Sequence, residues 1–166
     1  MKVYDWGGYE LLEEAKTRSG KKLDCEVEVY VAGILARLFE GDIYDDAKPL
    51  AIAYMESATS DNIFQRISGL KTVADGALVF AGLFPLNSRR KNVTVGYFTE
   101  IGTNAYNDLS STKHGAIFYK MAIHFTDVRN CLNTLQDRMY DHVDIKELIQ
   151  AGYEKSLGEN VIVGPW

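Results

Sequence analysis

Few residues in this chain of 166 have the types and spacing that chemistry requires. Asp75 comes just before the apolar run 77–84, so its ionised carboxylate would need a cationic partner. The nearest candidates are Lys71, Arg89 and Arg90. The favoured interpretation is an ion pair that fixes the 85–92 loop, because a catalytic carboxylate would need a second acid or a metal ligand, and the sequence indicates neither.

The histidines do not form a known metal motif. His114, His124 and His142 are scattered, without the HExxH or ExxH spacing of metal-binding helices. His124 and Asp127 are three residues apart on one predicted helix, which a metal site could use, but a surface or partner-facing polar pair is favoured. We therefore predict no metal, no cofactor and no catalytic residue.

Aromatic residues are the remaining unusual feature, with ten tyrosines and two tryptophans. Such side chains favour protein interfaces, although they also fill cores. Several lie near the chain ends, where a core covers them least: Tyr4, Trp6, Tyr9, Tyr140, Tyr153 and Trp166. This distribution favours an interaction module.

Composition limits the class of protein. The chain is 46% hydrophobic and 25% charged, which is ordinary for one globular domain spanning residues 1–166. A net charge of −5 argues against nucleic acid as a partner, and the N-terminus lacks the apolar region of a secretory signal. Cys25 and Cys131 lie in apolar segments and are predicted to be buried free thiols, so we expect a cytoplasmic protein that does not enter a membrane.

Hydrophobic periodicity predicts an all-α, single-domain bundle of about seven helices. Their expected spans are Gly7 or Gly8 to Arg18, Asp24–Glu40, Asp45 or Asp46 to Ala58, Asp61–Phe84, Thr94–Leu109, Phe118–Met139 and Asp144–Leu157. The fourth is the long central helix, which ends at Phe84-Pro85 because proline disfavours a helical residue before it. Its inner stripe is predicted to be Ile63, Ile67, Leu70, Ala74, Ala77 and Ala81.

Two features predict close packing. Gly102 inside the fifth helix costs roughly 1 kcal/mol relative to alanine, which contact with the Ala77–Ala81 region would offset. The 118–139 helix has apolar residues at alternating spacings of three and four: Phe118, Met121, Phe125, Val128, Leu132, Leu135 and Met139. This seam fits either an antiparallel bundle helix or a coiled-coil dimer, and both remain open.

The C-terminal residues 159–166 cannot continue a helix, because Pro165 follows the stop at Gly158. Free in solvent, their β-branched residues and Trp166 would promote association. We expect an extended tail that docks through Trp166, either on its own bundle or across a dimer interface.

Several short blocks appear in a recognisable order. They are Ala74–Pro85, Arg90, Val93, Tyr97-Phe98, Gly102 and Ala105-Tyr106. This arrangement resembles a family of uncharacterised bacterial all-helical proteins with the pattern GDxALFxxGFFP, RxxV, YYxxxG and AY. The chain departs from the pattern at Ala74, Val79 and Phe98. The resemblance implies a helical fold and a bacterial cytosolic setting, and it implies no catalytic residue.

The leading hypothesis is a non-catalytic helical interaction module that forms a homodimer or binds a protein partner. The alternative is an enzyme or small-ligand-binding protein whose pocket is lined by tyrosines. The candidate ligand or interaction residues are Asp75, Arg89, Arg90, Tyr97, Tyr106, His124 and Trp166.

Overall fold

Six α-helices and no strand make up the part of the chain that the computed structural model describes, residues 3–39, 49–84 and 94–137. The helices are α1 (Val3–Ser19), α2 (Cys25–Phe39), α3 (Leu50–Ala58), α4 (Ile63–Leu83), α6 (Val95–Ser110) and α7 (Ala116–Asn133). The all-α prediction is confirmed. The helix predicted from Asp144 to Leu157, the tail 159–166 and the caps Asp45 and Asp46 lie outside the described residues.

Two helices are capped at their N-termini by the predicted residues. The Asp24 carboxylate accepts hydrogen bonds from the backbone N–H groups of Glu26 and Val27 at the start of α2, at 2.9 and 3.4 Å. The Thr94 hydroxyl accepts one from the Tyr97 N–H at the start of α6. Both side chains satisfy donors that a helix N-terminus leaves unpaired.

Two other predicted starts were wrong. Asn62 caps α4 in place of Asp61, because its side-chain oxygen accepts from the N–H groups of Phe64 and Gln65. The first helix begins at Val3 instead of Gly7 or Gly8. Gly8 therefore lies inside this helix. Its lack of a side chain lets α2 approach closely, since a Cβ atom there would lie 2.3 Å from the Ala32 carbonyl oxygen.

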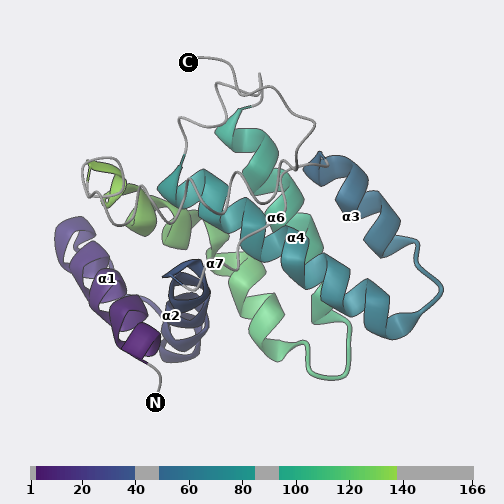
Figure 1. Cartoon of the computed structure of the whole chain (residues 1–166), viewed down its shortest axis with the longest axis horizontal. Coiled ribbons are helices and arrows are strands. Elements are labelled where there is room, and N and C mark those ends of the chain that lie inside the picture. The colour runs from purple at the N-terminus through teal and green to yellow at the C-terminus, as the bar shows by residue number, and fades with distance from the viewer. Residues whose placement is uncertain (1–2, 40–48, 85–93, 138–166) are drawn as a thin grey trace.

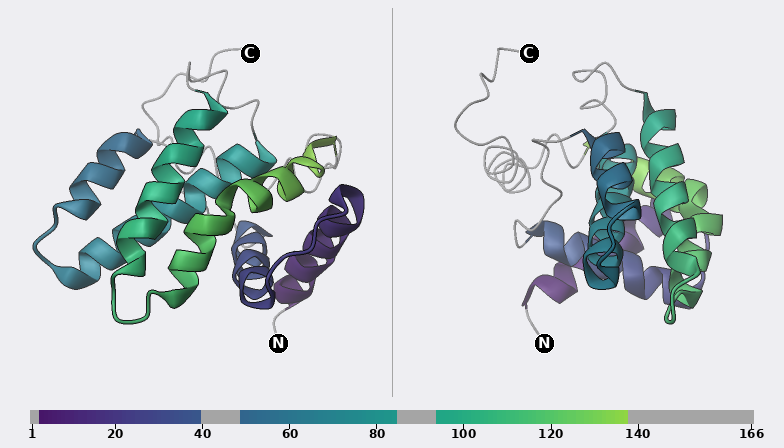
Figure 2. Two further views of the ribbon diagram at one scale, coloured as in Figure 1. Left: turned by 180° about the vertical axis from the view of Figure 1, so that it is seen from behind. Right: turned by 90° about the vertical axis from the view of Figure 1, so that its right-hand side faces the viewer.

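The helices surround α4, which lies near the centre of the molecule (Figure 1). It packs against α3, α6 and α7, and seen from the side α3 and α4 form one layer while α6 and α7 form the next (Figure 2). The α1–α2 pair lies at the end of the molecule opposite α3 and packs on α7. The last half of α4, from Val73 to Leu83, is buried on every side, as the apolar run predicts. The helix ends at Leu83 with buried Phe84 as its C-cap, which confirms the predicted stop.

The predicted seam belongs to the core of the monomer. Its residues Met121, Phe125, Val128, Leu132 and Leu135 are each at most 1% exposed, and Phe118 packs on the core from its edge. The seam therefore offers no described surface for a coiled-coil dimer. Helix α7 ends at Asn133, before the predicted end at Met139, and the Thr134 hydroxyl donates to the Cys131 carbonyl at the break. Met139 lies outside the described residues.

The two cysteines differ in environment. Cys131 is buried, as predicted, but Cys25 is exposed. Cys25 is the first residue of α2 and falls outside the apolar stripe that Val27 and Val31 continue into the core. None of the described helices combines the length and apolarity that a membrane span requires.

Candidate functional site

Asp75 is the one charged residue that is buried within the described part of the chain, at 7% exposure. The helical repeat places it on α4 one turn beyond Lys71, with apolar core residues on both sides. An ionised carboxylate in such a setting requires hydrogen-bond donors or cations to replace water.

Four donors from three helices surround this carboxylate. Its Oδ1 accepts hydrogen bonds from the hydroxyl groups of Tyr30 on α2 and Tyr106 on α6, at 2.7 and 2.6 Å. Its Oδ2 accepts from Arg37 Nη2 on α2 and Lys71 Nζ on α4, at 2.7 and 2.8 Å. We call these five residues the Asp75 cluster. It links α2, α4 and α6 through one side chain.

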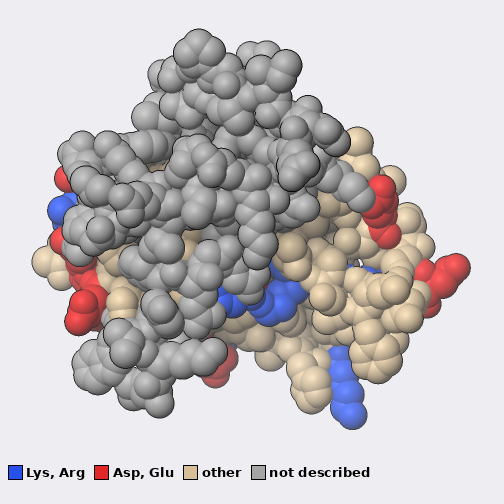
Figure 3. Space-filling model, viewed as in Figure 1, with Lys and Arg blue, Asp and Glu red and all other residues tan. Residues whose placement is uncertain are grey.

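The two cations place one side of the cluster near solvent. The side chains of Arg37 and Lys71 are 39% and 33% exposed, whereas that of Asp75 is 10% exposed. Basic side chains reach the surface near the middle of the face shown in Figure 3, over α4. The carboxylate is thus inside the protein with its positive partners at the boundary.

The phenol side of the cluster is held by aromatic packing. Tyr30 meets the rings of Tyr106 and Phe118 edge-on, with ring centres 6.1 and 5.9 Å apart. Tyr106 stacks on Phe118 and also contacts Phe125, and Lys71 Nζ lies 5.3 Å from the centre of the Tyr30 ring. These tyrosines are part of a packed core, with their hydroxyl groups directed at Asp75.

Both phenols are held in the neutral form. Burial, followed by the negative charge of Asp75, raises the pKa of Tyr30 and of Tyr106 well above the ordinary value of 10.0. Neutral hydroxyls remain donors, which is the state that the Asp75 carboxylate requires. The carboxylate therefore has two donors on each of its oxygens. The arrangement is suited to holding three helices together.

Alkaline pH is expected to unfold the protein through these phenols. Tyrosine ionises near pH 10 in the unfolded chain but at higher pH in the folded protein, so the stabilisation is complete below pH 10 and is lost as the pH rises further. We expect the free energy of unfolding to fall above about pH 10, and Tyr30 and Tyr106, among the ten tyrosines, to ionise only on unfolding. Ultraviolet titration of tyrosinate beside circular dichroism measures both. Ionisation of all ten tyrosines in the folded state would contradict this prediction.

The structure brings some predicted residues together and separates others. Asp75 and Tyr106 share the cluster, and Lys71 is confirmed as a partner of Asp75. Tyr97 is elsewhere, where its hydroxyl accepts a hydrogen bond from the Ala51 N–H at 3.1 Å and connects α6 to α3. His124 is half-buried on α7. Arg89, Arg90 and Trp166 lie outside the described residues.

The predicted role of Asp75 in fixing the 85–92 loop concerns residues outside the described ones. The described partners of its carboxylate are on α2, α4 and α6, because the helix directs it into the bundle. Of the predicted polar pair on α7, His124 is half-buried, and Asp127 is exposed and forms an ion pair with Lys21, at 3.4 Å. In the described ranges no three His, Cys, Asp or Glu side chains are arranged to hold a metal ion.

Sequence reasoning missed Tyr30 and Arg37. They are seven residues apart on α2, two turns along one side of the helix, beside the buried stripe that contains Val27 and Val31. Polar residues at that spacing next to an apolar face were a usable signal. Their common partner on another helix was not visible in the sequence.

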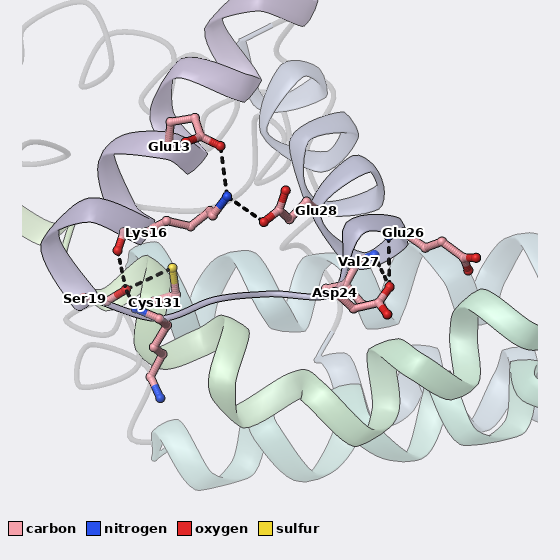
Figure 4. Close-up of polar contacts among 9 residues, drawn as sticks. Glu13, Lys16, Ser19, Asp24, Glu26, Val27, Glu28 and Cys131 are labelled. Atoms are coloured by element: carbon pink, nitrogen blue, oxygen red, sulfur yellow. Dashed lines mark hydrogen bonds and ion pairs between the residues drawn. The ribbon is translucent and has the colours of Figure 1, made fainter.

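A second polar cluster connects α1 to α2 and α7 (Figure 4). Lys16 Nζ lies 2.6 Å from Glu28 and 3.0 Å from Glu13, and these bonds raise the Lys16 pKa above its ordinary value. The Ser19 hydroxyl donates to the sulfur of Cys131 at 3.5 Å. Burial raises the pKa of this thiol, which keeps it protonated and unreactive. These contacts explain how the helices are joined and present no reactive group.

A groove of about 770 Å³ opens between the first half of α4 and the residues after α6. We call it the α4–α6 groove. Its lining comprises Ala58, Ile63, Arg66, Ile67, Leu70, Asp108, Ser111, Thr112 and Lys113. Ile63 was predicted to begin the buried stripe of α4, but it is 44% exposed, because the groove begins at this end of the helix.

Large apolar side chains are exposed on α3 and at the start of α4, the two elements that contribute Ala58 and Ile63 to the groove. Phe64, at the start of α4, is 80% exposed, and on α3 Met55 and Ile52 are 58% and 49% exposed. The surface over α3 and the start of α4, on the right of Figure 3, combines uncharged side chains with separate acidic and basic groups. Exposed apolar surface of this kind, next to a concave feature, is typical of interaction sites.

Comparisons of the chain with models of protein families, with curated proteins and with solved structures each found no match. The resemblance to bacterial all-helical proteins stays a prediction, and the function has to be argued from the geometry.

Proposed function

We propose that the protein is a non-catalytic helical interaction module that binds a segment of a protein partner in the α4–α6 groove. The observation that supports this most directly is the exposure of Ile63, which lines the groove, and of Phe64, which follows it on α4. Removing such side chains from water contributes roughly 25 cal/mol for each Å² of apolar surface, so a partner that covers them gains affinity. Aromatic anchors commonly dominate interfaces of this kind.

The Asp75 cluster supports a non-catalytic role. Its acidic group is 7% exposed and accepts hydrogen bonds on both oxygens, so it has no described path to a reacting molecule. Tyr30 and Tyr106 contribute to the core and to this bond network, which favours a structural role for these two residues over a place in the tyrosine-lined pocket of the alternative hypothesis.

A partner segment is favoured over a second copy of the chain. The seam on α7 is the main argument for a homodimer, and of its described residues all but Phe118 are buried inside the monomer. Of the terminal aromatic side chains that the sequence singled out, that of Tyr9 is described and is 45% exposed. Light scattering distinguishes a monomer that binds a partner segment from a homodimer. We expect a monomer. A dimer that dissociates in the Phe64→Ser variant would instead assign the groove to self-association.

Replacing Ile63 or Phe64 should weaken partner binding without unfolding the protein. Random peptides displayed on phage would be selected on the immobilised full chain, and the enriched peptides measured by fluorescence anisotropy. We expect Phe64→Ser and Ile63→Ser each to weaken binding by about tenfold or more, corresponding to about 1.4 kcal/mol or more. The melting temperature should change little, because both side chains are exposed.

Val29→Ser is the matched control, because Val29 is a 55% exposed apolar residue on α2, at the other end of the molecule. It should leave peptide affinity unchanged. Peptides that bind all three variants as tightly as the original chain would refute the groove as the docking site.

A further inference from the structure

Two basic side chains face the α4–α6 groove from opposite walls. Arg66 comes from α4 and Lys113 from the residues that connect α6 to α7 (Figure 1). Within the described ranges, neither side chain makes a hydrogen bond or an ion pair. By contrast, Lys16, Lys21 and Lys120 each form an ion pair with an acidic side chain.

The groove also contains one acid, but this acid already has a partner. The Asp108 carboxylate accepts a short hydrogen bond from the Tyr54 hydroxyl of α3. The lining therefore carries two positive groups and one negative group, and the negative group helps to hold α3 in place. Between the charges the surface is apolar, formed by Ile67 and by Leu70, which is 2% exposed.

From this arrangement we infer that the partner segment is acidic and amphipathic, with an apolar side on Ile67 and Leu70 and carboxylates that pair with Arg66 and Lys113. This inference rests on the proposed function. Charge complementarity across an interface selects partners more than it adds affinity, so the two cations would determine which apolar segments the groove accepts. A segment with basic residues at the same positions would be rejected by like-charge repulsion.

Charge reversal tests this inference with the peptides selected on the full chain. Enriched peptides are expected to combine apolar residues with Asp or Glu, and their affinity should decrease as salt is added. The Arg66→Glu, Lys113→Glu double variant should weaken them by about tenfold or more. The same variant should bind peptides in which the acids are replaced by lysine more tightly than the original chain does.

Lys113→Glu alone can be compared with Lys22→Glu, because both lysines are exposed and both changes alter the net charge equally. The control should leave affinity unchanged at fixed salt.

If Phe64→Ser abolishes binding while charge reversal has no effect, or if the enriched peptides are basic, the inference fails and the proposed function stands. If Phe64→Ser has no effect, the proposed function itself fails. If dodecanoate binds the groove more tightly than every selected peptide, the occupant is a small amphipathic carboxylate and the inference is overturned.

Discussion

Asp75→Asn is expected to lower the free energy of unfolding by about 2–4 kcal/mol. The amide keeps the shape of the side chain but removes the charge that Arg37 and Lys71 neutralise, and its NH2 group cannot accept their hydrogen bonds. Breaking a fully buried ion pair costs about 3–5 kcal/mol. The expected loss is smaller because the two cations are 39% and 33% exposed and can be hydrated.

Urea unfolding followed by circular dichroism measures this loss. Asp127→Asn is the matched control, because it removes the same charge from an exposed ion pair with Lys21. The control should cost less than about 1 kcal/mol. Equal midpoints for the two variants would show that the Asp75 cluster contributes no more than a surface pair.

Gly102→Ala is expected to destabilise the protein even though alanine favours helix over glycine by about 1 kcal/mol. A Cβ atom at this position would lie 2.5 Å from Phe125 Cε2 and 3.0 Å from Ala77 Cβ. The Phe125 ring is 1% exposed, so it would have to shift within the packed core. Overpacking costs about 1–3 kcal/mol, and Gly102→Leu should cost more than Gly102→Ala.

Gly33→Ala, also inside a helix, is expected to have the opposite effect on stability. A Cβ atom on Gly33 of α2 would have no neighbour within 4 Å, so this change should stabilise by up to about 1 kcal/mol. For a domain of this size each 1 kcal/mol shifts the melting temperature by about 2–4 °C, so the two variants should move it in opposite directions. A raised melting temperature for Gly102→Ala would mean that α6 and α7 can separate without cost.

Local signals in the sequence were sufficient for the helices and for part of the site. Thr94 and Asp24 cap their helices because a cap depends on the next few residues. Lys71 reaches Asp75 because four residues are one helical turn. The contact of Gly102 with Ala77 was also predicted, since a helical glycine indicates a close neighbour.

The remaining features depend on how helices distant in the sequence meet. Tyr30 and Arg37 approach Asp75 from α2, 45 and 38 residues away, and periodicity on α2 does not reveal which helix it faces. The α4–α6 groove likewise joins residues of two chain segments. Ile63 continues the apolar stripe of α4, and its exposure follows from where the neighbouring helices end. Such facts belong to the tertiary structure.

The attachment of α3 has a consequence for the dynamics of the molecule. This helix has nine residues with Leu50 as its buried residue, whereas α4 buries every residue from Val73 to Leu83. Tyr97 and Tyr54 fasten α3 to α6 by single hydrogen bonds. Local opening free energies follow buried contacts, so amide hydrogens of α3 should exchange with solvent through small openings and those of α4 only on global unfolding. Because Ala58 of α3 lines the groove, any molecule bound there has to restrain a helix that opens more readily than α4.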